Sequence, residues 1–156
     1  MGRIYTVSFD GVAVTAVQDL FEIVAPADSI VLIHELQLSQ ETEIADAQEE
    51  MLNLVLKSGQ TTSGSGGTAP TAIPRLFADA AAGTTAEVNN TTEASTGTIV
   101  THQVWNWNVR IPFVNIWTPE TRPVLSPSRR ATIEMTTTPA DSITMGGTLV
   151  IEEIGG

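Results

Sequence analysis

The sequence predicts an all-β protein, an antiparallel β-sandwich with a jelly-roll-like arrangement of about eight strands. Three observations predict it. Apolar residues recur with a period of two in at least seven segments. Turns rich in Gly, Pro, Asn and Asp separate those segments. No two segments enclose a convincing amphipathic helix of ten residues, so the crossover helices of a parallel sheet are not expected. The 156 residues suffice for one domain, which we place at 1–156.

The strand segments follow one another along the chain with short interruptions. In the first, Tyr5, Val7 and Phe9 lie on one face until Gly11 breaks the pattern, which Val12 resumes. The further segments are 20–24, 29–39, 51–56, 99–104, 105–113, 131–137 and 143–154. Two glycines at 146–147 predict a bulge or a sharp bend in the last of them. The one helix candidate is the acidic stretch 41–51, in which we expect at most one or two helical turns.

Alternation within two of these segments predicts the core. In 29–39, Leu32, His34 and Leu36 share a face, and in 105–113 the residues at every odd position are apolar. The side chains that we expect to be buried are Leu32, Leu36, Trp107, Val109, Ile111 and Ile133. The Trp105 and Trp107 pair also admits two other interpretations, a protein interface and a platform for sugar rings. Trp117, which follows Pro112, is predicted to be the exposed aromatic residue.

A long arm at 58–84 interrupts the strand pattern. Its first 17 residues, 58–74, carry no charge and consist mainly of Gly, Ser, Thr, Pro and Ala. Ordering each residue costs about 1–2 kcal/mol of backbone entropy, and the arm has few apolar side chains to offset it. We therefore expect the arm to be either mobile or ordered by a neighbouring chain, with Ile73, Leu76 and Phe77 as anchors.

A second unusual segment is 118–130, which three prolines stiffen and exclude from a central strand. It contains Arg122, Arg129 and Arg130, three of the seven basic residues of the chain. We expect these arginines to contact an acidic patch on a partner.

The charge balance excludes several classes of partner. Eighteen acidic residues against seven basic ones give a net charge of −11, which disfavours binding to the phosphates of nucleic acid. The longest aliphatic run, 30–33, is far short of the ~20 residues that cross a membrane. No basic segment precedes an apolar stretch at the N-terminus, so no signal peptide is expected. We therefore predict neither nucleic acid nor membrane as a partner.

The sequence contains no catalytic signature. His34 and His102 are the only histidines, and both lie on apolar strand faces, as core histidines with satisfied rings do. A metal site of the cupin kind needs several imidazoles and a carboxylate. The acidic residues at 41–50 do not have the spacing of a calcium-binding EF-hand loop, so a solvated face is expected there. We predict no catalytic residue, no metal and no cofactor, and hence a protein that is not an enzyme.

Several stretches together resemble a family of small proteins encoded among the structural genes of tailed bacteriophages and prophages. They are GRIYTVSF (2–9), AVQDLFEI (16–23), EEML (49–52), TTSGSGG (61–67), VNNTT (88–92), RPVLSP (122–127), PADSITM (139–145) and EEIGG (152–156). The resemblance spans nearly the whole chain, and it brings no catalytic residues with it.

The resemblance implies a virion component, above all a capsid decoration (cement) protein on the capsid exterior. Such a protein would be made in the host cytoplasm, bind the major capsid protein lattice and form a homo-oligomer, for which the resemblance favours a trimer. The alternative is a tail- or fibre-associated module that recognises a host-surface glycan through Trp117 or through Trp105 and Trp107.

Overall fold

The computed structural model describes residues 2–42 and 49–155. These residues form eleven strands and no helix. The strands are β1 (Arg3–Val14), β2 (Gln18–Val24), β3 (Ser29–Gln40), β4 (Met51–Thr62), β5 (Ile73–Pro74), β6 (Thr85–Asn90), β7 (Ser95–Asn108), β8 (Phe113–Ile116), β9 (Val124–Leu125), β10 (Arg130–Met135) and β11 (Ile143–Gly155). The helix candidate at 41–51 falls mostly outside the described residues, and Met51 already belongs to β4.

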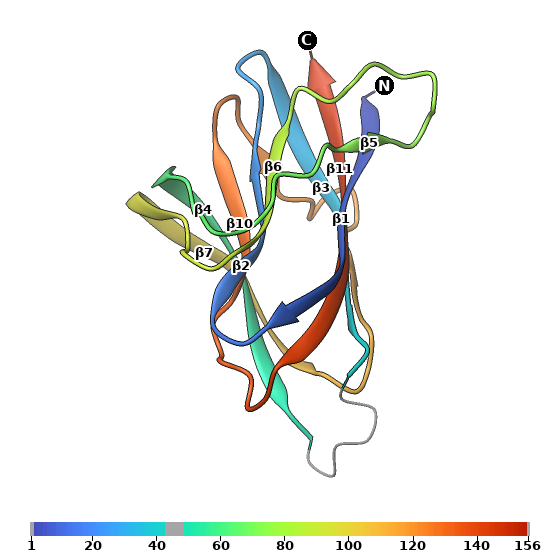
Figure 1. Ribbon diagram of the computed structural model, residues 1–156. Helices are drawn as coiled ribbons and strands as arrows, with labels where there is room; N and C mark the ends of the chain where they lie inside the picture. The colour runs from blue at the N-terminus through green and yellow to red at the C-terminus, as the bar shows by residue number, and fades with distance from the viewer. Residues whose placement is uncertain (1, 43–48, 156) are drawn as a thin grey trace.

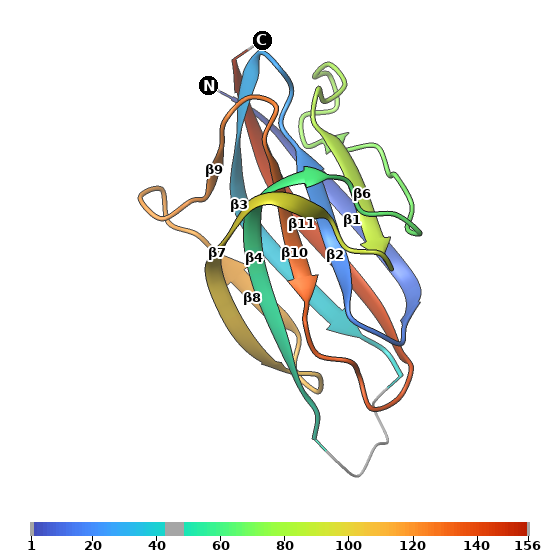
Figure 2. The ribbon, with the colours of Figure 1, turned by 90° about the vertical axis from the view of Figure 1, so that its left-hand side faces the viewer.

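Two antiparallel sheets pack against each other, which confirms the predicted sandwich (Figures 1 and 2). The first sheet has the order β5-β1-β11-β3-β8, and β9 pairs with β3. The second has the order β6-β2-β10-β4-β7. There are more strands than expected because the arm and the proline-rich segment contribute the short strands β5 and β9, and because β6 forms at 85–90. The jelly-roll assignment stays a prediction. The arrangement of β1 to β4, which alternate between the two sheets, is compatible with it.

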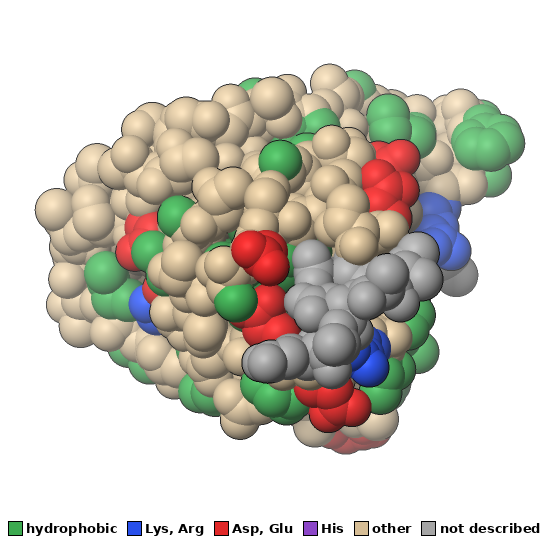
Figure 3. Space-filling model, turned by 60° about the horizontal axis from the view of Figure 1, so that its bottom comes forward, with side chains coloured by type: hydrophobic (Ala, Val, Ile, Leu, Met, Phe, Trp, Pro, Cys, Tyr) green, Lys and Arg blue, Asp and Glu red, His purple; other side chains and the backbone are tan. Residues whose placement is uncertain are grey.

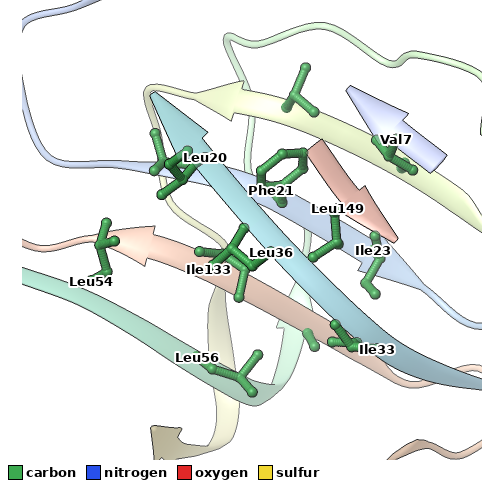
Figure 4. Packing of buried hydrophobic residues seen from close by; sticks show 14 of the residues in the cluster. Val7, Leu20, Phe21, Ile23, Ile33, Leu36, Leu54, Leu56, Ile133 and Leu149 are labelled. Carbon is green, nitrogen blue, oxygen red and sulfur yellow. The ribbon is translucent and has the colours of Figure 1, made fainter. Parts of the chain in front are cut away.

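The core lies between the sheets and is built from large apolar side chains of both (Figure 4). Leu36 and Ile133 are buried there, as predicted, and so are Trp107 and Val109. Two members of the predicted core are wrong. Leu32 is only half-buried, and Ile111 is 62% exposed.

A β-bulge in β3 explains why Leu32 is not in the core. Val150 of β11 pairs with Glu35, but the next residue, Ile151, pairs with Ile33, so β3 contains one extra residue at His34. An extra residue reverses the side-chain alternation beyond it. Ile33 and Leu36 therefore both face the core, and Leu32 points the other way.

Ile111 is exposed because 105–113 is two strands rather than one. β7 ends at Asn108, and β8 begins at Phe113 in the other sheet. Between them the amide of Ile111 donates to the carbonyl of Asn108 across 3.1 Å, which closes a tight turn. The indole N–H of Trp107 donates to the carbonyl oxygen of Ile111 at 2.6 Å. The backbone carbonyl of Ile111 thus provides the hydrogen-bond acceptor for the buried Trp107, while the side chain of Ile111 lies in solvent.

The predicted irregularity at 146–147 is present, but the extra residue lies on the partner strand. Phe9 pairs with Gly147 and Val12 with Met145, so β1 bulges opposite the glycines. A Cβ on Gly147 would lie 2.8 Å from Leu38 and 2.9 Å from Phe9. The glycine therefore lets these two core side chains meet across the strand.

Candidate interaction surfaces

The first half of the arm is ordered by its own chain, so the prediction that a neighbouring chain must order it is wrong. β4 continues to Thr62 and pairs with the start of β7. Beyond it, Ser65 bridges to Thr92 and Thr68 to Val88. The arm then reaches the opposite sheet, where β5 pairs with β1 (Figure 1). Backbone hydrogen bonds thus order a segment that has almost no apolar side chains.

One buried carboxylate holds the arm in place. Glu22 of β2 accepts hydrogen bonds from the hydroxyl of Ser63 at 2.6 Å and from the amide of Gly64 at 2.9 Å. It also accepts one from the side-chain amide of Asn90 at 3.0 Å, and it lies 2.6 Å from the guanidinium Nε of Arg130. Nothing in the sequence near 63–64 indicates this partner, because Glu22 lies some forty positions away.

The last part of β4 and the first part of β7, residues 56–62 and 95–103, pair as a two-stranded ribbon. This ribbon folds over the outer face of the second sheet (Figure 2). Two register shifts bend the ribbon, one at His102 and one opposite Gly59. Gly59 has a φ of +93°, and a Cβ there would lie 2.0 Å from the carbonyl oxygen of Thr98. Only glycine fits this bend.

A buried polar layer lies beneath the ribbon. Glu134 of β10 pairs with Lys57, the only lysine of the chain, at 2.6 Å, and Gln60 donates to the hydroxyl of Thr132 at 2.9 Å. One oxygen of Asp19 accepts from the amide of Ala94 at 2.7 Å, and its other oxygen has no partner among the described residues.

Asp19 is the strained member of this layer. The pKa of its carboxyl is raised to about 7, chiefly because the group is buried. The hydrogen bond from Ala94 opposes this shift, and the nearby carboxylates of Glu134, Glu22 and Glu93 contribute to it. Burial also raises the pKa of Glu93, and the charge of Glu134 adds to that shift. The layer therefore contains more carboxylates than cations to pair with them. The contribution of this layer to the stability of the fold therefore depends on pH.

The second half of the arm presents an apolar knob, which we define as Leu76 and Phe77. Phe77 is 93% exposed and Leu76 63% exposed. The loop that carries them is braced: the amide of Arg75 donates to the carbonyl of Ile4, and the hydroxyl of Tyr5 donates to the carbonyl of Ala80. Burying a Phe or Leu side chain is worth about 1.5–3 kcal/mol, which the isolated chain does not gain here. Ile73, the third predicted anchor, is 55% exposed at the base of the knob.

A groove lies at the opposite edge of the first sheet, between the ribbon and β9. Its volume is about 300 Å³, and its floor is formed by Leu56, Leu125 and Ala131. Ser58, Gly59 and His102 of the ribbon and residues 123, 124 and 126 also line it. Arg129 and Arg130 lie at the rim, and the described residues that line the groove include no Asp or Glu.

The three predicted arginines have different environments. Arg129 is exposed, and the structure shows no ion pair for its guanidinium within the described residues. Arg130 is half-buried and forms an ion pair with Glu22. Arg122 is also half-buried, and its Nε is buried without a hydrogen-bond partner in the described chain. Arg129 alone among the three is presented to solvent as expected.

The prediction that Trp117 is the exposed aromatic residue is wrong. Trp117 is buried rather than exposed, and its indole N–H donates to the side chain of Gln103 at 2.7 Å. Its ring meets that of Trp105 edge to face at 6.0 Å, and Trp105 meets Phe113 in the same way at 5.8 Å. Trp105 is half-buried. The aromatic residues of β7 and the β8 end therefore close the sandwich where its two sheets meet.

The two histidines differ. His34 is only half-buried, so it is not the core residue that was predicted, but its Nε2 lies 2.8 Å from a carboxylate oxygen of Glu152 and its ring has a partner as predicted. His102 is exposed, and its Nε2 lies 2.7 Å from the hydroxyl of Ser58, so its predicted place in the core is wrong. The bulge at His102 turns it away from the sandwich.

Within residues 2–42 and 49–155, no cluster of three or more His, Cys, Asp or Glu side chains could hold a metal ion. No helix in that part of the chain is long and apolar enough to span a membrane. Acidic side chains outnumber basic ones on the face that Figure 3 shows.

No protein-family model matches the chain, and no curated protein matches it in sequence.

Proposed function

We propose that the protein is a non-enzymatic structural component of a tailed-bacteriophage virion, a capsid decoration protein that binds the major capsid protein lattice on the capsid exterior. The observation that carries the proposal is the knob: an aromatic and an aliphatic side chain in solvent, on a loop whose backbone is hydrogen-bonded on both sides. Apolar side chains that a hydrogen-bonded loop holds in solvent are typical of a site at which a protein docks onto a partner.

Two further features support a role in assembly. The arm spans both sheets and is tied down along its length, so the knob has a defined position on the protein. The net charge of −11 keeps the chain away from the phosphates of nucleic acid in the infected host cytoplasm, where it would be made.

The glycan-binding alternative loses its main support, and we do not advance it. It relied on exposed tryptophan rings, but Trp107 and Trp117 are buried, and Trp105 packs edge to face against its neighbours. A platform for a sugar ring needs an aromatic face open to solvent.

The test is the copy number of the protein in purified virions of the phage that encodes it, measured by quantitative mass spectrometry. A decoration protein is present in hundreds of copies, and Phe77→Ala lowers that number. Ile116→Ala is the matched control, because Ile116 is 70% exposed but lies on β8, away from the knob. A handful of copies per particle, or none, would refute the proposal.

A further inference from the structure

The edge of the second sheet at β7 is long and open (Figure 2). β7 has 14 residues and pairs on one side only, with β4. All of its side chains except that of Trp107 are exposed or half-buried. An edge of this kind presents backbone amides and carbonyls to a further strand, and proteins protect most such edges with charges, proline, bulges, short length or a covering segment.

The other edges of the two sheets have this protection. The arm covers β6 through the bridge between Thr68 and Val88. The part of β1 that β5 leaves uncovered contains Asp10 and a β-bulge. β8 has four residues and β9 has two.

The second half of β7 has none of these devices. Residues 94–109 contain no Asp, Glu, Lys, Arg or Pro. The two register shifts of β7 lie at or before His102, and residues 103–108 pair with β4 in an unbroken register. This regular stretch is therefore the unprotected part of the edge.

The hydrogen bonds to β4 show which backbone groups of this stretch are free. The amide of Val109 donates to the carbonyl of Glu50 at 3.1 Å, so the backbone groups of Val109 point toward the β4 side. In an antiparallel pair this direction alternates from one residue to the next. Val104 and Asn106 therefore direct their amides and carbonyls away from β4, where no described residue bonds to them.

We propose that β7 of one copy pairs antiparallel with β7 of a second copy, with Val104 opposite Asn106 of the second copy and a two-fold axis at Trp105. This register uses every one of the free amides and carbonyls at these positions in both chains. The two Trp105 residues then face each other across the axis, where aromatic cross-strand pairs stabilise a sheet. The contact does not depend on the proposed capsid role, because it involves only this chain and does not use the knob.

Charge explains why a second copy fits at this edge. Two chains with a net charge of −11 repel each other wherever their acidic side chains meet. Residues 94–109 carry no acidic side chain, and neither do residues 51–56 of β4 beside them. The two-fold pairing therefore places no carboxylate opposite its counterpart, and each copy offers the other the same free backbone groups in the same alternation.

The symmetry of the contact defines the assembly. The same surface is used on both copies, so the contact closes at a dimer and does not continue as a filament. It therefore predicts a dimer in solution, in place of the trimer that the resemblance favours.

Val104→Pro tests the pairing because proline lacks the amide that the second copy needs. Within its own chain this amide bonds to nothing described, and sheet edges accept proline where the N–H faces solvent, so the fold should tolerate the change. Val104→Thr is the matched control, since it keeps the amide and a β-branched side chain at a position that is 58% exposed. Phe77→Ala is the second control, because it removes the knob and leaves this edge intact.

Sedimentation and native mass spectrometry at up to about 1 mM measure the dissociation constant. We expect dimers of the parent chain, of Val104→Thr and of Phe77→Ala. Val104→Pro should weaken dimerisation by about tenfold or more.

Hydrogen exchange in the parent chain, measured by NMR, gives a readout that needs no variant to fold. The amides of Val104 and Asn106 should exchange quickly in dilute solution and more slowly as the concentration rises. The amides of Leu76 and Phe77 should exchange at the same rate throughout.

Single cysteines test the register, because the chain has no cysteine of its own. Residues opposite each other at a hydrogen-bonded position lie about 5.5 Å apart between Cα atoms, which is within the reach of a disulfide. A mixture of Val104→Cys and Asn106→Cys should therefore form a disulfide-linked dimer faster than either variant alone.

A parent chain that stays monomeric, Val104→Pro that dimerises like the parent, or a mixture of cysteine variants that reacts no faster than its components would each overturn the proposal. A monomeric parent whose copy number in virions falls with Val104→Pro would assign the edge to a strand of another virion protein instead. The two proposals fail separately: a dimer that is absent from particles refutes the decoration role alone, and a monomer present in hundreds of copies refutes the β7 pairing alone.

Discussion

The two halves of the arm behave in opposite ways. Residues 63–68 have small polar side chains and no charge, yet they are held against the second sheet by backbone bonds and by Glu22. Leu76 and Phe77, the apolar residues of the other half, remain in solvent. Order in this arm therefore follows hydrogen-bond partners rather than hydrophobicity, and its apolar residues are left available for a second molecule.

Deleting residues 60–68 should have the largest effect on folding. The deletion removes the hydrogen bond from Gln60 to Thr132 and the two hydrogen bonds that Ser63 and Gly64 donate to Glu22. It also removes the pairing between the end of β4 and the start of β7. We expect a loss of more than about 5 kcal/mol, which is comparable with the whole stability of a typical domain. Thermal melting followed by circular dichroism measures it. An unchanged midpoint would mean that the arm is a mobile appendage.

Glu22→Ala isolates the contribution that the buried carboxylate of Glu22 makes to stability. It leaves the guanidinium of Arg130 and two donors of the arm without their acceptor, which should cost about 3–5 kcal/mol. Urea denaturation measures the loss, and limited proteolysis should show new cleavage within 63–68. Glu120→Ala, at an exposed turn, is the control and should leave both readouts unchanged.

Exchanging the two adjacent arginines for glutamate separates folding from binding. Arg130→Glu places a second carboxylate beside Glu22, so we expect a loss of about 2–4 kcal/mol in chemical denaturation. Arg129→Glu changes an exposed group and should alter stability by less than about 0.5 kcal/mol. It should instead lower the number of copies that purified virions carry, and the difference from the parent chain should become smaller as salt is added during assembly. Equal losses of stability in the two variants would contradict the contrast between them.

The buried layer predicts a pH dependence with a defined sign. Asp19 has a folded-state pKa of about 7, above the ~3.9 of an unfolded Asp, so between these values the folded state binds the extra proton. Stability is therefore full below about pH 4 for this group and falls as the pH rises through 7. Between pH 5 and 8 the loss should be about 2–3 kcal/mol.

Asp19→Asn tests the pH dependence, because an amide oxygen can still accept from Ala94 but does not ionise. Denaturation by urea at pH 5 and pH 8 should show a shallower loss for this variant than for the parent. Glu93 also has a pKa raised by burial, so a smaller slope of the same sign should remain. Identical pH profiles for the two chains would show that Asp19 is not the group responsible.

The smallest effect on stability belongs to the knob. Because Phe77 is almost fully exposed, Phe77→Ala should change the free energy of unfolding of the isolated chain by less than about 0.5 kcal/mol. Thermal melts at low protein concentration measure this. A loss of several kcal/mol would show that the ring is buried within its own chain, and would remove the basis for an interaction surface there.

Period-two patterning was a sound guide to the strands but not to their faces. Leu36, Trp107, Val109 and Ile133 are buried as predicted. Leu32 is not, because one extra residue at His34 reverses the alternation, and an apolar strand pattern gives no sign of where such a residue sits. The surfaces were predicted in part: Phe77, Leu76 and Arg129 are exposed, whereas Trp117 is buried and Arg130 is occupied by a distant carboxylate.

The amino-acid sequence by itself determined the class of the protein. Alternating apolar residues, turn residues between them and the lack of an amphipathic helix lead to antiparallel strands in two packed layers, because local periodicity dictates which elements can bury an apolar face. Only the tertiary structure decided which polar groups became buried and which apolar ones did not. Glu22, Asp19 and Glu134 acquired their environment from a ribbon that folds back over their sheet, and pairings across 40 to 80 positions leave no local trace in the sequence.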